Sequence, residues 1–199
     1  FLSTNSWINK KRSIDQWKNW ANKGASSKAV VNHPDLFTID GRNGPLTYEV
    51  ELYQGCVRFK RGCKFCIEPK KGIPIWREEQ DIIDEVNLAI ENGVQNIRLG
   101  GATDVYTYKA EGVLDLEYPI PNPEPISDLL FGLRENENLQ ILHVDNGNPS
   151  IIAENLGPST EITKAMIDTL SDGAVLSFGL ESADPLVHSN NWLNCDPKQ

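Results

Sequence analysis

The amino-acid sequence predicts an α/β fold built around a parallel sheet, and two observations support this prediction. First, segments with the alternation of a β-strand are followed repeatedly by segments whose apolar residues have helical spacing. Strands and helices in this order are joined by right-handed crossovers, which make the strands parallel. Second, glycine and polar residues follow each of four predicted strands. The carboxyl ends of parallel strands are where α/β folds assemble their binding sites.

The predicted elements follow one another in a regular order. Residues 1–46 are predicted to form an N-terminal connector with one helix over 13–23, capped by Ser13, and residues 47–199 the domain itself. Every second residue from Pro119 to Pro125 is proline, which indicates an irregular segment before the second helix of the domain. The predicted strands span residues 48–53, 94–99, 139–144 and 174–180, and the predicted domain helices span 78–92, 126–135 and 161–170.

Composition and charge limit the possible classes of function. The chain has 199 residues, of which 39% are hydrophobic and 24% charged, as is typical of a globular domain with a sizeable core. It has no run of about 18 apolar residues and no visible secretory leader, so we expect a cytoplasmic protein without a membrane segment. The net charge of −9 does not indicate a nucleic-acid-binding surface. A basic run from Arg58 to Lys64 is either a solvated face or local positive charge beside an anionic cofactor.

Three of the four cysteines, Cys56, Cys63 and Cys66, are close together in the sequence with the spacing C-x6-C-x2-C. Cysteines this dense in a chain without a leader indicate a metal site in a reducing compartment rather than a disulfide framework. Three thiolates can bind three irons of a 4Fe–4S cluster and leave the fourth iron open to another ligand. The alternative is a structural zinc site completed by Cys195 or a histidine, although zinc sites favour paired spacings.

The cysteine segment and the ends of the later strands resemble the radical S-adenosylmethionine superfamily. The segment GCKFCIEP has an aromatic residue, Phe65, before the last cysteine, and RLGGATD, LHVDNGNP and GLESADP follow. The resemblance covers about residues 48–194. The usual superfamily spacing is C-x3-C-x2-C, whereas this chain resembles archaeal-type members with a stretched first gap. Because the chain starts with Phe1 rather than methionine, we expect it to be an internal piece of a longer protein.

The resemblance implies a fold, two cofactors and a reaction. The fold is a partial (βα)6 TIM-like barrel with about four βα units present and the C-terminal strands missing. The cofactors are S-adenosylmethionine and a 4Fe–4S cluster held by the three clustered cysteines. The reaction is reductive cleavage of S-adenosylmethionine to a 5′-deoxyadenosyl radical, which acts on a substrate that the sequence does not identify. It requires a reductant such as ferredoxin or flavodoxin.

The end of the second strand is implied to contact the methionine part of S-adenosylmethionine. Gly100 and Gly101 would let the backbone pass close to its amino group, because glycine has no side chain to block the approach. Asp104 is the first acidic residue after this pair and is the candidate partner of the amino group. The plainer alternative for the glycine pair is an ordinary strand-to-loop turn.

The remaining predicted cofactor-binding residues follow the other strands. The carboxylate of Glu181, next to Ser182, would accept hydrogen bonds from the ribose hydroxyls. Asp145 and Asn146 would contact the methionine part or the substrate, with a plain Asn-Gly turn as the alternative. Phe65 completes the set, and no catalytic side chain is assigned.

Two other functions stay open from the sequence alone. One is a non-catalytic scaffold whose cysteines bind zinc, and the other is a domain that binds S-adenosylmethionine without cleaving it. Tyr106 and Tyr108 either line a substrate cleft or pack the long loop onto the domain. Arg98, within the second predicted strand, is expected to make an ion pair.

Overall fold

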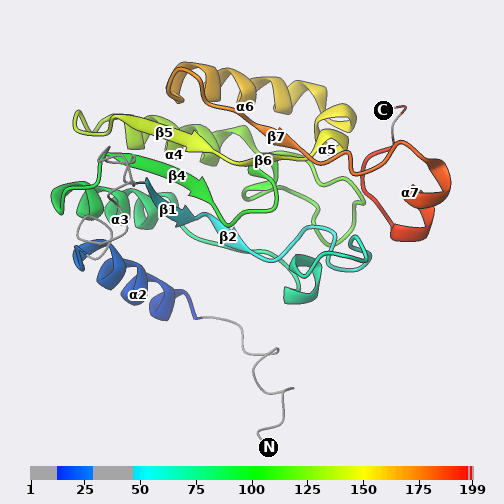
Figure 1. Cartoon of the computed structure of the whole chain (residues 1–199), viewed down its shortest axis with the longest axis horizontal. Coiled ribbons are helices and arrows are strands. Elements are labelled where there is room, and N and C mark those ends of the chain that lie inside the picture. Colours follow the sequence, from blue (N-terminus) through cyan, green and yellow to red (C-terminus); the bar gives the residue numbers. More distant parts are fainter. Residues whose placement is uncertain (1–12, 29–46, 197, 199) are drawn as a thin grey trace, which may run out of the picture.

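The fold is seen in a computed structural model that describes residues 13–28, 47–196 and 198 (Figure 1). The elements are α2 (Ile14–Ser26), β1 (Thr47–Glu51), β2 (Tyr53–Gln54), the 3-10 helix η2 (Glu68–Lys71), β3 (Ile75–Trp76), α3 (Glu79–Glu91), β4 (Asn96–Gly100), the 3-10 helix η3 (Val105–Thr107), α4 (Pro123–Arg134), β5 (Ile141–Val144), β6 (Asn146–Gly147), α5 (Pro149–Glu154), α6 (Leu156–Thr169), β7 (Ser177–Phe178) and α7 (Pro185–Asn191).

The central sheet is parallel and has the strand order β1–β4–β5. Val50 pairs with Leu99, and Leu99 pairs with Val144, so the three strands are in register toward their carboxyl ends. Two small sheets accompany it, the antiparallel pair β2–β3 and the parallel pair β6–β7. The predicted α/β class and the parallel sheet are therefore confirmed, and the described residues form no closed barrel.

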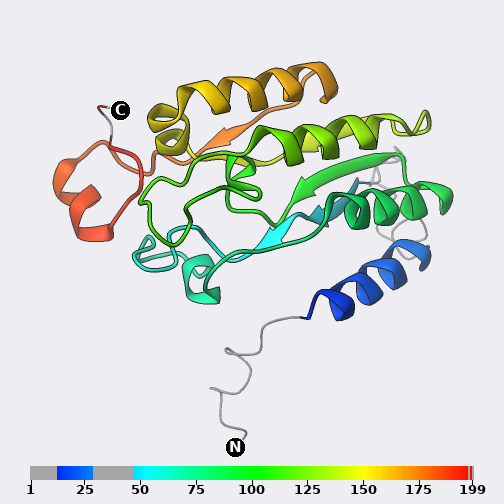
Figure 2. The same ribbon diagram turned by 180° about the vertical axis from the view of Figure 1, so that it is seen from behind.

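The two faces of the central sheet differ because successive strand residues point to opposite sides. On one face, Ile97 and Leu142 are fully buried in a core that also contains side chains from α3, α4 and α6. These three helices lie next to one another along the same side of the sheet (Figure 2). On the other face, Glu49, Arg98 and His143 form a row of polar side chains across β1, β4 and β5.

The helices form where apolar residues recur at helical spacing. In α3, Ile82, Val86 and Ala89 are fully buried against the sheet. Full burial of an aliphatic side chain of the size of isoleucine or valine contributes about 1.5–3 kcal/mol. This helix layer therefore fixes the positions of the strand ends from which the functional loops leave.

A buried ionic network joins α3 to the sheet and to α2. Arg77 is only 1% exposed and donates from Nε to Asp81 Oδ2 at 3.0 Å and from Nη1 to Glu85 Oε2 at 2.5 Å. Its Nη1 also donates to the Glu51 carbonyl at 3.2 Å, and the ring of Trp17 lies 5.7 Å from the guanidinium carbon. Buried charges are tolerated when they are paired and hydrogen-bonded in this way.

The N-terminal helix agrees with its prediction. Ser13 caps α2 by accepting a hydrogen bond from the Gln16 amide at 3.1 Å, and the helix packs against α3. Most of the predicted connector, residues 1–12 and 29–46, lies outside the described residues. The division of the chain at residue 46 therefore stays a prediction. In the ranges that the structure covers, no helix is both long and apolar enough to cross a bilayer.

Several predicted boundaries need correction. Helix α4 begins at Pro123, three residues before its predicted start, because proline at the first helical position has no useful N–H to lose. The sequence pattern predicts neither α5 nor α7. The predicted strand over residues 174–180 is reduced to Ser177–Phe178, and it pairs with β6 instead of joining the central sheet.

Candidate functional site

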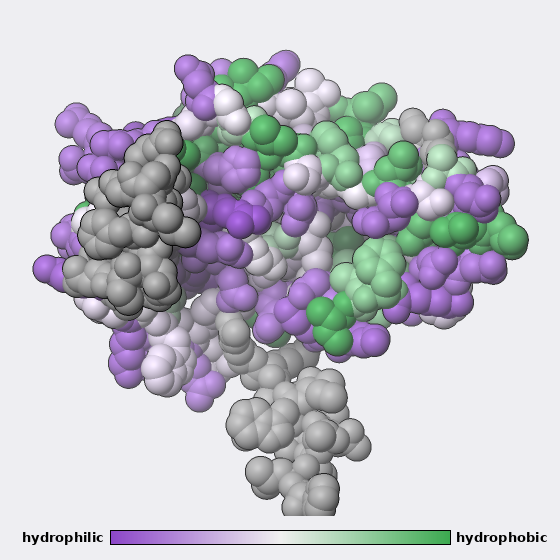
Figure 3. Space-filling model, in the orientation of Figure 1, coloured by the Kyte–Doolittle hydropathy of each residue, from purple (hydrophilic) through white to green (hydrophobic). Residues whose placement is uncertain are grey.

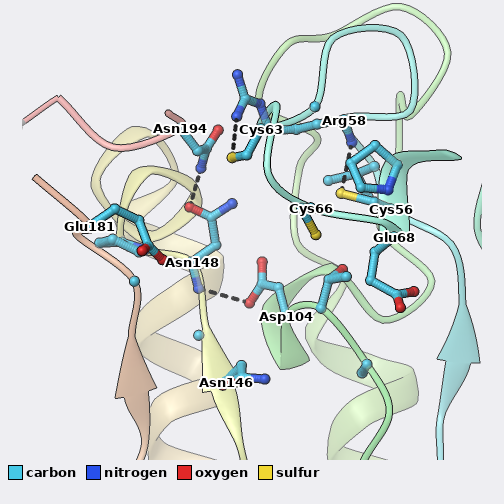
Figure 4. Close-up of a pocket in the computed structure, with 18 of the residues that line it drawn as sticks. Cys56, Arg58, Cys63, Cys66, Glu68, Asp104, Asn146, Asn148, Glu181 and Asn194 are labelled. Atoms are coloured by element: carbon cyan, nitrogen blue, oxygen red, sulfur yellow. Dashed lines mark hydrogen bonds between the residues drawn. The ribbon is translucent and has the colours of Figure 1, made fainter. Parts of the chain in front are cut away.

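A cavity of about 460 Å³ opens where β4, β6 and β7 end, and the cysteine loop, residues 56–66, forms its opposite wall (Figure 4). Its size lies in the range of small-molecule binding sites. The position agrees with the rule that parallel α/β folds assemble sites at the carboxyl ends of their strands. The predicted site residues that line it are Cys56, Cys63, Phe65, Cys66, Gly101, Asp104, Asn146 and Glu181.

Glycines determine the path of the cysteine loop. Gly55 has φ +100°, and a Cβ there would lie 2.7 Å from the Gly72 carbonyl oxygen. The same carbonyl accepts a hydrogen bond from the Cys56 amide at 3.3 Å. A Cβ on Gly62 would lie 2.0 Å from Pro69 Cγ. Both glycines are thus required for the loop to fold back tightly on the segment that follows it.

The three thiols of the cysteine loop face the same space. Cys56, Cys63 and Cys66 all line the cavity, and Figure 4 shows their sulfur atoms on its cysteine-loop side. Arg58 donates to two of these sulfurs, from its backbone N–H to Cys56 Sγ at 3.4 Å and from Nη1 to Cys63 Sγ at 3.4 Å. Burial raises the pKa of the Cys56 thiol, which favours its protonated form in the metal-free chain.

The described residues do not form a single-ion site. Within them, no three His, Cys, Asp or Glu side chains come together closely enough to hold one metal ion. The predicted fourth zinc ligand, Cys195, is buried outside the cavity, and its thiol donates to the Asp196 carbonyl at 3.6 Å. His188 contacts the Cys195 carbonyl through Nε2. These contacts count against Cys195 as the fourth ligand of a zinc site.

The same donor set fits a 4Fe–4S cluster. In a cubane each cysteine binds a different iron, so the sulfurs share one cavity without converging on one point. Hydrogen bonds to the sulfur atoms, such as those from Arg58, are a recurrent feature of iron–sulfur sites and tune their potentials. Cys56, Cys63 and Cys66 are therefore suitable cluster ligands.

Asp104 forms the floor of the cavity opposite the thiols. It is 2% exposed, and its Oδ1 accepts hydrogen bonds from the amides of Tyr106 and Asn148, both at 3.0 Å. Its Oδ2 is buried and has no hydrogen-bond partner among the described residues. Burial raises the pKa of Asp104 to about 7. This oxygen is thus available to a ligand that carries an N–H or O–H donor.

Of the predicted glycine pair, only Gly101 lines the cavity. Its φ of +69° is rarely adopted by residues with a side chain, and a Cβ there would lie 2.6 Å from Glu51 Cγ. Gly100 faces away from the cavity, and a Cβ on it would lie 2.7 Å from Glu49 Oε1. The close approach of backbone to a ligand is thus possible at Gly101.

The other predicted cofactor-binding residues also divide into those that line the cavity and those that do not. Glu181 lines the cavity and has φ +64°, an uncommon value for a residue other than glycine. Ser182 is not among the lining residues, and its Oγ accepts a hydrogen bond from the Asp184 amide at 3.1 Å. Asn146 lines the cavity, whereas Asp145 is bonded to Arg98 on the polar face of the sheet.

Two asparagines that the sequence pattern did not single out connect the cavity walls. Asn148 accepts a hydrogen bond from Asn194 Nδ2 through its Oδ1, and its own amide donates to Asp104 (Figure 4). Asn194 Oδ1 is buried and accepts no hydrogen bond from any residue that the structure describes. Asn148 lies in the polar run after the third predicted strand, so the strand-end rule could have found it. Asn194 carries no local signal, because only the fold brings it to the cavity.

The two tyrosines of the long loop pack it onto the domain. Tyr106 and Tyr108 are 2% and 1% exposed. Tyr106 shares a hydrogen bond of 2.9 Å with Thr163, and Tyr108 donates to the Arg77 carbonyl at 2.7 Å. Of the two interpretations, packing of the loop is therefore the one that the structure supports.

Comparison with known proteins finds relatives that this chain matches over only part of their length. No protein-family model matches the chain. An uncharacterized protein of Methanocaldococcus jannaschii is 36% identical over 94% of this chain, and one of Archaeoglobus fulgidus is 35% identical over 90%. The chain spans about a third of their length, 33% and 31%. A tRNA-2-methylthio-N(6)-dimethylallyladenosine synthase of Geobacter sulfurreducens is 32% identical over 61% of this chain and 25% of that enzyme. Such methylthiotransferases are radical S-adenosylmethionine enzymes.

Proposed function

We propose that this chain is the catalytic part of a radical S-adenosylmethionine enzyme. The observation that carries the proposal is the placement of three thiols, spaced C-x6-C-x2-C, around one cavity at the carboxyl ends of parallel strands. The partial relationship to tRNA methylthiotransferases supports the superfamily. The cysteine spacing itself rests on the chain's own residues.

The proposed architecture is part of a (βα)6 barrel. The polar face of the central sheet, with Glu49, Arg98 and His143, would then be the barrel interior, and the helix layer its outside. The β6–β7 pair would continue the barrel wall beyond β5. Further strands would be needed to close it.

Each wall of the cavity has a separate task in this proposal. Cys56, Cys63 and Cys66 would hold the cluster, with Arg58 donating to two of the sulfurs. When bound, the cluster and S-adenosylmethionine supply the reductive cleavage that generates a 5′-deoxyadenosyl radical. Asp104 would accept a hydrogen bond from the ligand through its unpartnered Oδ2, and Gly101 would allow close approach of the backbone.

The remaining polar groups would orient the nucleoside end of the ligand. Glu181 reaches the cavity from the strand end opposite the cysteine loop, where a carboxylate can accept hydrogen bonds from two neighbouring hydroxyls (Figure 4). Asn146 lies nearby on β6. A one-electron donor such as ferredoxin or flavodoxin would supply the electron.

Anaerobic reconstitution with iron and sulfide tests this function. The parent chain should bind close to four irons and four sulfides, absorb near 400 nm, and give 5′-deoxyadenosine when S-adenosylmethionine and dithionite are added. The triple variant Cys56→Ala, Cys63→Ala, Cys66→Ala should lose iron and sulfide, whereas the matched variant Cys195→Ala should retain both. Bound zinc without sulfide would favour a scaffold, and a cluster without 5′-deoxyadenosine would favour a domain that binds the cofactor without cleaving it.

A further inference from the structure

The positive charge of this acidic chain is concentrated in one segment. Residues 58–71 contain six basic residues and one acidic residue, which gives a net charge of +5. The rest of the chain has 13 basic and 27 acidic residues, a net charge of −14. The net charge of the whole chain, −9, therefore conceals a group of cations in the segment that carries the cysteine loop, although Asp115 and Glu117 line one pocket with Lys60 and Arg61.

Most of these cations are exposed and form no ion pair with an acid in the part of the chain that the structure describes. Lys60, Arg61, Lys64, Lys70 and Lys71 are all exposed. Among the described residues, only Lys71 of these five forms an ion pair, with Glu68 at 2.6 Å. If acidic neighbours neutralised these cations, more of the five would form such ion pairs. This group of five is called the basic surface below.

Exposed aromatic side chains accompany the basic surface. Phe65 is 64% exposed and lies at the rim of the cavity. Trp192 is 40% exposed, and its ring lies 4.7 Å from Lys64 Nζ and 5.4 Å from the Arg61 guanidinium carbon. Hydrophilic and apolar side chains are interspersed over the end of the molecule that carries the cysteine loop and α7 (Figure 3). Cations beside exposed aromatic rings are the combination that binds single-stranded nucleic acid.

These cations could serve two other roles: to balance the charge of a cluster, or to dock an acidic redox protein. Both roles fit the surface less well than binding of single-stranded nucleic acid does. Charge balance needs cations in contact with the sulfurs, yet within the described residues only Arg58 makes such a contact through a charged side chain. Docking of an acidic redox protein would use the cations but gives no reason for the exposed rings of Phe65 and Trp192 that accompany them. Stacking of bases gives such a reason for both rings, including Phe65, which only the resemblance assigns to the cofactor.

We propose that the basic surface binds the phosphate backbone of an RNA strand and that Phe65 stacks on one of its bases, so that a neighbouring nucleoside reaches the cavity. The proposal names a substrate class for the proposed function and rests on that function for the chemistry at the cavity. RNA binding itself does not require the cluster, so the two are tested separately. The tRNA nucleoside in the name of the Geobacter relative is consistent with this ligand.

The test measures binding of a fluorescein-labelled, unstructured 20-nucleotide RNA by anisotropy over a range of KCl concentrations. The variant Lys60→Gln, Lys70→Gln, Lys71→Gln removes three cations that contact no cysteine. Lys23→Gln, Lys28→Gln, Lys164→Gln is the matched control, with the same charge change at exposed sites on α2, after it and on α6. For single strands each lost phosphate contact changes the slope of log K against log salt by about 0.7. We expect the first variant to lose roughly 2 from this slope and the control to keep the parent slope.

A second pair of variants tests the stacking contact. Phe65→Ala should weaken binding by roughly 5-fold to 100-fold without changing the salt slope, while Phe131→Ala, at an exposed position on α4, should leave it unchanged. No RNA binding by the parent chain, or equal losses in the two lysine variants, would overturn the proposal. The proposal would also be overturned if the first lysine variant bound RNA as the parent does but its cluster were reduced more slowly by flavodoxin. Iron and sulfide analysis of the same samples shows separately whether the proposed function fails.

Discussion

Replacement of Asp104 by asparagine should stabilise the chain in a pH-dependent way. Burial raises the pKa of this carboxyl to about 7 in the folded state, against about 3.8 in an unfolded chain. The folded state therefore holds the proton more tightly, and the chain loses stability as the pH rises from about 4 to about 7. Above that range the loss is complete, because the carboxylate is ionised in both states.

The magnitude follows from the size of the shift. Each pH unit inside this window costs about 1.4 kcal/mol, so a window of about three units costs roughly 4 kcal/mol. Asparagine has nearly the shape of a protonated aspartate, and its Oδ1 can still accept from the amides of Tyr106 and Asn148. It does not ionise, so it avoids this cost. The stability advantage of Asp104→Asn should thus grow by about 3 kcal/mol between pH 5 and pH 8.

Urea unfolding followed by tryptophan fluorescence measures this difference in the metal-free, reduced chain. The two proteins share every other titrating group, so those contributions cancel when the variant is compared with the parent at each pH. A constant offset, whatever its sign, would reflect only packing of the new amide. A stability difference that is the same at pH 5 and pH 8 would refute the raised pKa and the reasoning from burial.

Two further substitutions test the fold around the site. Arg77→Leu should destabilise the chain by about 3–5 kcal/mol in urea unfolding, because it removes the cation that two buried carboxylates share, although Asp81 keeps its ion pair with Lys18 at 3.4 Å. The control is Arg98→Leu, because the Arg98 side chain is 47% exposed in its ion pairs. We expect this variant to cost at most about 1 kcal/mol. Similar costs for Arg77→Leu and Arg98→Leu would disprove the importance of burial. Gly101→Ala and Gly173→Ala both place a side chain at positive φ, at a strain of roughly 1–2 kcal/mol. Only Gly101→Ala adds a clash, with Glu51, so thermal denaturation should show a larger loss of stability for Gly101→Ala than for Gly173→Ala. Equal losses of stability would mean that the loop relaxes freely around the new side chain.

The parts of the fold that could be predicted are those encoded by local patterns. Helix α3 follows from the spacing of its apolar residues, and the cap of α2 follows from Ser13. Strand β4 follows from its alternation and from the glycines at its end. Each of these signals lies within one element, so no knowledge of tertiary contacts is needed to interpret it.

The candidate site was predictable to the extent that it depends on strand ends. The strand-end rule marked the loops, the cysteine spacing indicated the metal site, and the resemblance singled out Asp104 and Glu181; all of these residues and Asn146 line one cavity. Asp145 lies outside the cavity lining, because the neighbouring strand supplies Arg98 as its partner on the polar face. The strand-end rule could not find Asn194, whose contact with the cavity comes from a segment that folds back over the third strand end.

The cysteine loop is held in place by hydrogen bonds to residues that come much later in the sequence. Arg58 donates to the Trp192 carbonyl at 3.0 Å, across a separation of 134 residues, and the Lys64 amide donates to the Asn191 carbonyl at 3.0 Å. During synthesis the three thiols therefore leave the ribosome before the segment that secures their loop exists. At roughly 5–20 residues per second this interval lasts on the order of ten seconds. In that interval the cysteine loop lacks its contact with Trp192, and the loop is fastened only after that residue has been made.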